Sequence, residues 1–162
     1  MTMTRTTGGT TAALISGFLA VTLAGCSAGE GASLGEVVTL AEAGASNPTV
    51  AADGRGSFLV AWVQRGPEGG DVYLARLGAD GVPQGEPVRV NDVPGDADPH
   101  EQAPAQVAVG PGGEVYVVWQ RKVDAPWLEF GGADLRLARS GDGGRTFEPA
   151  ITVNDNPPGS PA

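Results

Sequence analysis

The sequence predicts an all-β protein built from two copies of one four-stranded antiparallel unit. The main observation is an internal repeat, because residues 49–92 recur, strand by strand, as residues 106–155. The clearest match is FLVAW at 58–62, which returns as VYVVW at 115–119. The chain also holds 26 Gly and 13 Pro residues, a turn-rich composition that suits many short strands better than long helices. A repeat of this length predicts that one supersecondary unit is stacked on its copy.

The first 25 residues are predicted to be a lipoprotein signal peptide. Arg5 provides a positive start, and the apolar stretch 11–23 is too short to span a bilayer comfortably. It ends in LAGC at 23–26, which resembles the bacterial lipobox, so we expect Cys26 to be lipidated and to become the new N-terminus. An ordinary secretory signal or a buried structural cysteine are the alternatives. The protein is therefore expected in the cell envelope, exported and lipid-anchored to a bacterial membrane.

The charge of the chain limits its partners. The formal net charge is −9, and removal of the signal peptide would take away Arg5 and no acidic residue. An acidic surface disfavours nucleic acid and anionic lipid head groups. Membrane attachment would then depend on the acyl chains alone, whose binding grows by about 0.8 kcal/mol per buried CH₂.

The chain after the signal peptide is predicted to contain a tether and two repeats. Residues 26–46 are small and polar and are expected to form a flexible tether, in which the apolar patch 37–40 could add one outlying strand. The first repeat spans 47–93 and the second 94–156, while 157–162 is interpreted as the start of a truncated third repeat. The predicted strands are 49–52, 57–64, 71–77 and 88–91 in the first copy, and 106–109, 114–120, 134–139 and 151–154 in the second.

The apolar patterns of these strands differ along each copy. The second strand is apolar on both faces, which is typical of a strand between two layers. The third and fourth strands alternate apolar and polar residues, which is typical of half-exposed strands. Burial is thus expected to fall from the inner strands to the outer ones, as in a blade of a β-propeller.

A turn in the second copy carries a recognisable motif. Ser140-x-Asp142-x-Gly144-x-Thr146-Phe147 resembles the Asp-box of the sialidase-like (BNR-repeat) β-propeller family. The resemblance implies two four-stranded antiparallel blades, a fragment of a six-bladed propeller. The residue types suit a structural role, because Asp can accept turn N–H groups and glycines can take positive φ. We expect the Ser140 and Thr146 hydroxyls to pair across the hairpin and Phe147 to cover the apolar layer.

The family resemblance does not carry an active site to this chain. Sialidases need an arginine triad, a Tyr nucleophile with a Glu partner and an Asp acid/base. Here Tyr73 and Tyr116 both fall inside predicted strands, and no catalytic residue can be assigned. The favoured function is a non-catalytic propeller that presents loops for glycan or protein binding. The alternatives are a fragment of an exo-sialidase or related glycoside hydrolase, and a purely structural envelope protein.

Candidate ligand residues lie in two connections. The long loop 121–132 of the second copy holds Arg121, Asp124, Trp127 and Glu129, and a tryptophan in a polar loop can stack on a sugar face or a partner side chain. The alternative is that Trp127 folds back to seal its own loop.

The second connection is the linker 96–101 between the repeats, and it contains His100, the only histidine. Its acidic residues could hold a hard cation, but a solvated acidic loop is the favoured interpretation. We expect no metal and no cofactor. Self-association through unpaired blade faces is a further expectation, because uncovered apolar sheet faces drive association.

Lipidation is tested by Cys26→Ala. Because the acyl chains are expected to be the only membrane attachment, the variant should stay unprocessed or leave the membrane fraction. Membrane fractionation and gel migration measure both effects. A variant that fractionates and migrates like the parent chain would show that Cys26 is not the anchor.

Overall fold

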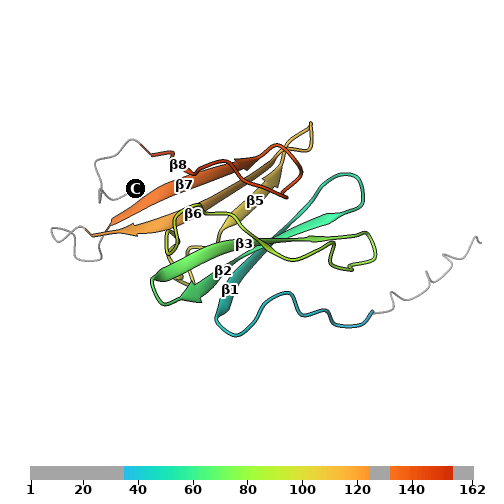
Figure 1. Cartoon of the computed structure of the whole chain (residues 1–162), viewed down its shortest axis with the longest axis horizontal. Helices are drawn as coiled ribbons and strands as arrows, with labels where there is room; N and C mark the ends of the chain where they lie inside the picture. Colours follow the sequence, from blue (N-terminus) through green and yellow to red (C-terminus); the bar gives the residue numbers. More distant parts are fainter. Residues whose placement is uncertain (1–34, 125–131, 155–162) are drawn as a thin grey trace, which may run out of the picture. The chain divides into compact units, whose positions relative to one another are not determined.

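Two four-stranded antiparallel sheets make up the part of the chain that the structure, a computed structural model, describes: residues 35–124 and 132–154. Each sheet is a meander with its strands in sequence order (Figure 1). The first sheet contains β1 (Ala45–Ala52), β2 (Phe58–Gly66), β3 (Gly69–Leu77) and β4 (Val88–Arg89). The second sheet contains β5 (Gln106–Val109), β6 (Val115–Val123), β7 (Gly132–Ser140) and β8 (Ile151–Thr152). The predicted all-β class is confirmed, and within these ranges no helix is long and apolar enough to cross a membrane.

Most strand boundaries differ from the predicted ones by one or two residues, and three kinds of difference affect the interpretation. β1 begins at Ala45, inside the segment predicted to be tether, and residues 37–40 form no strand. β6 continues to Val123, so Arg121 lies in a strand and pairs with Asp134 of β7. The fourth strand of each copy is only two residues long. β6 extends this far because residues 121–123 pair in register with residues 132–134 of β7, and their side chains alternate between the two faces of the sheet. A comparison of the two repeats alone cannot reveal this pairing.

β1 is interrupted near its start. Its register against β2 shifts between Ser46 and Thr49, and Asn47 between them has a φ of 54°. Pro48 follows, and proline cannot donate an N–H to a ladder, so the strand bulges there. The bulge turns the Asn47 side chain toward the linker between the sheets, where its Nδ2 donates to the His100 carbonyl over 2.7 Å.

Burial is greatest in the two middle strands of each sheet. The expected fall from the first strand outward is wrong, because β1 and β5 contain no buried residue. β3 and β7 are also more buried than their alternation predicted. The physical reason is position, since β1 and β4 are edge strands of the first sheet and β5 and β8 are edge strands of the second.

One hydrophobic core lies between the sheets. The inner face of the first sheet contributes Leu59, Ala61, Val63, Val72 and Leu74, with Val90 from beyond β4. The inner face of the second sheet contributes Val115, Val117, Trp119 and Ala138. The two sheets therefore share a single buried layer, and each has a second, outer face that lies away from the other sheet (Figure 1).

The linker between the sheets, residues 90–105, is bonded to both of them. Ala97 exchanges two backbone hydrogen bonds with Gly70 of β3, at 2.8 and 2.9 Å. Asp98 N donates to Gln120 O of β6 over 2.8 Å. Asp96 and Ala97 are buried, so the prediction of a solvated acidic linker is wrong at this point. Asp96 and Ala97 are buried because the backbone at Ala97 extends the first sheet while the Asp96 side chain enters the second.

Candidate functional site

The connections between strands gather at two opposite ends of the sheets. At the turn end lie the β1–β2, β3–β4, β5–β6 and β7–β8 connections. At the linker end lie the β2–β3 turn, the linker and the two strand ends, Asp124 and Gly132, that flank the β6–β7 connection. This places His100 and Arg121 at the linker end and the 140–147 turn at the turn end, as the predicted meander requires.

The turn 140–147, called here the Asp142 turn, is organised around one carboxylate. Asp142 Oδ1 accepts from Ser140 Oγ at 2.7 Å, from Arg145 N at 2.9 Å and from Thr146 N at 3.0 Å, while Oδ2 accepts from Thr146 Oγ1 at 2.7 Å. The hydroxyls of Ser140 and Thr146 thus meet on Asp142 and do not pair with each other, which corrects the sequence-based expectation. The Thr146 hydroxyl is the largest of the causes that hold the pKa of Asp142 far below its ordinary value.

The same turn packs into the core between the sheets. Gly144 is buried with a φ of 84°, and its N–H donates to Ser140 Oγ over 2.8 Å. A Cβ at this glycine would stand 2.7 Å from Leu74 Cδ2 of the first sheet, so the Leu74 side chain would have to move to admit one. Phe147 packs against the shared core, as expected. The turn is therefore a structural contact between the sheets. The side-chain oxygens of Ser140, Asp142 and Thr146 all take part in hydrogen bonds within the turn itself.

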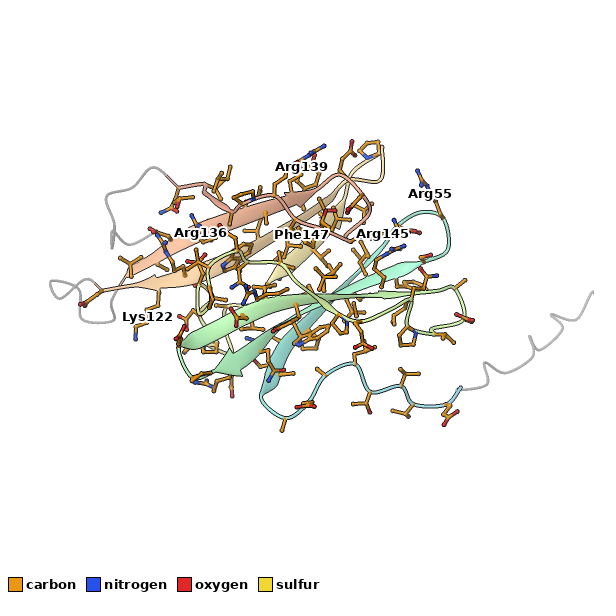
Figure 2. All side chains as sticks on the ribbon, viewed as in Figure 1. Arg55, Lys122, Arg136, Arg139, Arg145 and Phe147 are labelled. Carbon is orange, nitrogen blue, oxygen red and sulfur yellow. The ribbon has the colours of Figure 1, made fainter. Side chains whose placement is uncertain are left out.

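A groove of about 270 Å³ lies beside the Asp142 turn, between the turns of the two sheets. Figure 2 shows Arg55 and Arg145 at this end. The acids of the groove hold its turns, since Asp53 Oδ1 accepts the N–H groups of Arg55 and Ser57 at 2.7 and 2.9 Å. The backbone N–H of Arg55 is the main cause that lowers the pKa of Asp53. Arg145 donates to the Asp142 carbonyl over 2.8 Å, so the groove is mostly built from turn-stabilising groups.

A buried ionic network occupies the middle of the linker end. Asp96 Oδ2 accepts from Arg136 Nε at 3.0 Å, and Oδ1 accepts from Arg121 at 3.4 Å. Arg121 also pairs with Asp134, and Arg136 (Figure 2) donates to Thr152 Oγ1 over 2.8 Å. The hydrogen bond with Asp134 is the largest cause that raises the pKa of Arg121. Arg121, predicted as a ligand residue, is thus held by two carboxylates.

The other predicted ligand residues divide between exposed positions and positions outside the described ranges. His100 is exposed on the linker, and Asp124 is exposed at the end of β6. Trp127, Glu129 and Cys26 lie outside the residues that the structure describes.

A second hollow, of about 320 Å³, is formed around His100 at the linker end. Its lining consists of Arg65, Pro99, His100, Glu101 and Gln102. His100 Nδ1 accepts the Gln102 N–H over 3.3 Å, and this bond orients the ring. Within the described ranges, neither His100 Nε2 nor the side chains of Glu101 and Gln102 make a hydrogen bond. Among the described residues, this hollow therefore offers His100 Nε2 and the side chains of Glu101 and Gln102, which the fold does not use for hydrogen bonds.

Asparagines that close the ends of the sheets were missed by sequence reasoning. Buried Asn91 accepts from Val72 N at 2.7 Å and donates to Asp71 Oδ1 at 2.6 Å, and Asp71 also accepts the Gly95 N–H at 2.9 Å. In the second sheet, Asn154 likewise accepts from Leu135 N at 2.8 Å. The sequence did contain a signal for this role, because an Asp near the start of the third strand and an Asn after the fourth strand recur in both copies.

The two tyrosines, which a sialidase would need as a nucleophile, have packing positions. Tyr73 is stacked on Trp62 with ring centroids 6.0 Å apart, and Tyr116 lies opposite Arg139 across the β6–β7 ladder. Among residues 35–124 and 132–154, no three His, Cys, Asp or Glu side chains gather as metal ligands would.

Comparison of the chain with protein-family models, with curated proteins and with solved structures finds no match. The interpretation of the site therefore depends on the geometry described above.

The structural role of the Asp142 turn is tested by Asp142→Ala. At neutral pH the variant should lose about 1–3 kcal/mol of unfolding free energy, because several turn donors lose their acceptor. A carboxylate whose pKa is lower in the folded state than in the unfolded state stabilises the fold at pH values above its unfolded pKa of about 3.9. This stabilisation is lost as the pH falls toward the pKa of the folded state. The gap in unfolding free energy between the variant and the parent chain should accordingly narrow below about pH 4.

Urea unfolding at several pH values measures this gap. Glu86→Gln is the matched control, since it removes an exposed carboxylate that accepts no hydrogen bond from the described residues. An Asp142→Ala variant that keeps its stability but loses binding of a ligand would contradict the structural role.

Proposed function

We propose that this chain is an exported, lipid-anchored, non-catalytic protein of the Asp-box propeller type that binds a glycan or a protein at the cell envelope. The proposal combines three parts: the anchor at Cys26, the propeller-type arrangement of the two sheets, and a ligand site at the linker end. The anchor is supported by the LAGC junction at 23–26, and the other two parts by the contacts of the described residues.

The propeller arrangement is supported by the way the sheets pair. Each sheet is a four-stranded meander, and the inner face of one packs on the inner face of the other, as neighbouring blades do. The Asp142 turn, our proposed Asp-box, inserts Gly144 against Leu74 of the neighbouring sheet. An Asp-box between the third and fourth strands would then serve to fix the contact between blades.

At the turn end, the acids of the groove are used to hold its turns, and this favours binding over catalysis. Asp142 and Asp53 accept turn hydrogen bonds, and Arg145 donates to its own turn. A general acid or nucleophile must instead reach the substrate with an unoccupied group. The two described tyrosines pack within the sheets, so no observation on these residues favours the exo-sialidase alternative.

The observation that carries the binding proposal is the hollow around His100. It is open, it is lined by Arg65, His100, Glu101 and Gln102, and most of these polar groups have no partner among the described residues. Such groups donate to and accept from sugar hydroxyls or a partner's polar side chains. The β6–β7 connection, which carries Trp127, starts and ends at the same end of the sheets.

A glycan array probed with the soluble form, starting after Cys26, tests the proposal. Selective binding supports it, whereas release of sugar from the array would favour the glycoside hydrolase alternative. Failure to bind any glycan would leave a protein ligand as the remaining form of the proposal, and affinity capture from envelope proteins addresses that form.

The site itself is tested by alanine substitutions. Trp127→Ala or His100→Ala should weaken binding by about tenfold, because central aromatic contacts are each worth more than 1 kcal/mol. Arg145→Ala at the turn end is the matched control and should leave the affinity unchanged. The reverse ranking would place the ligand at the turn end and contradict the proposed site.

A further inference from the structure

The groove at the turn end is lined by three arginines, although the chain as a whole is acidic. The formal net charge of the chain is −9. The groove nevertheless has Arg55, Arg76 and Arg145 in its lining, and Figure 2 shows Arg55 and Arg145 at this end. Arg55 belongs to the β1–β2 connection, Arg76 lies near the end of β3, and Arg145 belongs to the Asp142 turn. The fold therefore brings positive charge together here from three separate segments.

The guanidinium groups of these three arginines have no carboxylate partner within the described ranges. Arg76 donates to the Gln84 amide oxygen over 3.3 Å, and Arg145 donates to the Asp142 carbonyl over 2.8 Å, so both acceptors are neutral. The side chain of Arg55 donates no hydrogen bond to the residues that the structure describes. The arginines that pair with acids in these ranges lie elsewhere: Arg121, Arg136 and Arg139. The charges in the groove are thus available to a ligand.

Two acids also line the groove, and both hold turns. Asp142 accepts from its own turn with both carboxylate oxygens, and Asp53 Oδ1 accepts two backbone N–H groups. Three guanidinium groups therefore stand against two carboxylates in the lining, which leaves an excess of positive charge. An anion that enters the groove meets free cationic donors, while the acids are turned to the backbone.

The positive groups are spread along the groove. A Cβ at Gly113, in the β5–β6 connection, would stand 3.6 Å from Arg55 Nη2, so Arg55 reaches from the first sheet to a turn of the second. A Cβ at Gly143 would stand 3.9 Å from Arg145 Nη1, so this guanidinium lies beside its own turn. The volume of about 270 Å³ is close to the lower end of the range for small-molecule sites.

We propose that the groove at the turn end binds a ligand that carries more than one phosphate group. The planar fork of a guanidinium matches phosphate oxygens in pairs, and a phosphate group presents several strong acceptor oxygens. Three guanidinium groups on three segments favour several such groups over a single one. The site is separate from the hollow around His100, and the inference does not depend on the proposed ligand of that hollow or on the lipid anchor.

Isothermal titration calorimetry with sodium tripolyphosphate, on the purified whole chain in mild detergent, is the first measurement. Binding should saturate at one site per chain and weaken as sodium chloride screens the charges. Inorganic phosphate should bind about tenfold more weakly or less, because it offers one group to the arginines. No binding of tripolyphosphate, or equal affinity for the two probes, would overturn the proposal. Citrate that binds as tightly as tripolyphosphate would also overturn it, since carboxylates would then serve as well as phosphates.

Substitution of single arginines places the site. Arg55→Gln and Arg76→Gln should each weaken tripolyphosphate binding by about tenfold, because hydrogen bonds to charged groups contribute roughly 1.5–3 kcal/mol. Arg89→Gln is the matched control, since it removes the same charge from an exposed position of β4 outside the groove lining. Its affinity should stay close to that of the parent chain. Equal loss in all three variants would show a general charge effect and would contradict the proposed site.

His100→Ala separates this site from the hollow at the linker end. The variant should bind tripolyphosphate like the parent chain, because His100 does not line the groove. Loss of tripolyphosphate binding in this variant, with binding retained in Arg55→Gln, would place the anion at the linker end and overturn the inference. Circular dichroism verifies that all the variants keep the β fold, so that a weaker affinity reports the groove and not unfolding.

Discussion

The pairing of the two sheets depends on Asp96, the buried acid of the linker. Its carboxylate binds Arg136 at 3.0 Å and Arg121 at 3.4 Å, and its carbonyl accepts the Trp119 Nε1–H at 2.9 Å. The next residue, Ala97, is hydrogen-bonded to the edge of the first sheet at Gly70. One short segment is thereby fixed to both sheets. A buried carboxylate is tolerated only when its charge and hydrogen bonds are matched, so this position permits very few arrangements of the sheets.

The turn end and the linker end of the sheets differ because Asp96 fixes the linker at only one of them. At the turn end, the polar groups of Asp142, Ser140 and Asp53 are used to hold turns, and Gly144 lets one turn enter the core against Leu74. At the linker end, the network of Asp96 fixes the backbone that carries His100. The fold thus holds His100 in place and, among the described residues, leaves its Nε2 and the side chains of Glu101 and Gln102 without a hydrogen bond, which suits a binding site on a rigid scaffold. We regard this division as the physical basis of the proposed function.

Much of the fold was predictable, because strand order and class can be derived from the repeat and from alternation. Three features were not. Burial at β1 depends on its being an edge strand, and a local pattern does not report which strand lies at an edge. The Arg121–Asp134 pair depends on the extension of β6, which the repeat comparison interpreted as a loop. The role of Asp96 depends on the path of the linker, because in sequence it is one acid among several in a turn-forming segment. The motif at 140–147 indicated the right residues, but only the structure shows that Ser140 and Thr146 both donate to Asp142.

The repeat provides a direct measurement of the central constraint. Trp62 and Trp119 occupy the same repeat position, but Trp119 donates to Asp96, whereas Trp62 Nε1 is buried with no acceptor among the described residues. Substituting phenylalanine removes a similar volume at both sites, so the difference in unfolding free energy reports the contact with the linker. In urea unfolding followed by circular dichroism, Trp119→Phe should cost about 1–3 kcal/mol more than Trp62→Phe, because it leaves a buried carbonyl unpaired. Equal costs, or a larger cost at Trp62, would show that the Asp96 linker does not hold the sheets together.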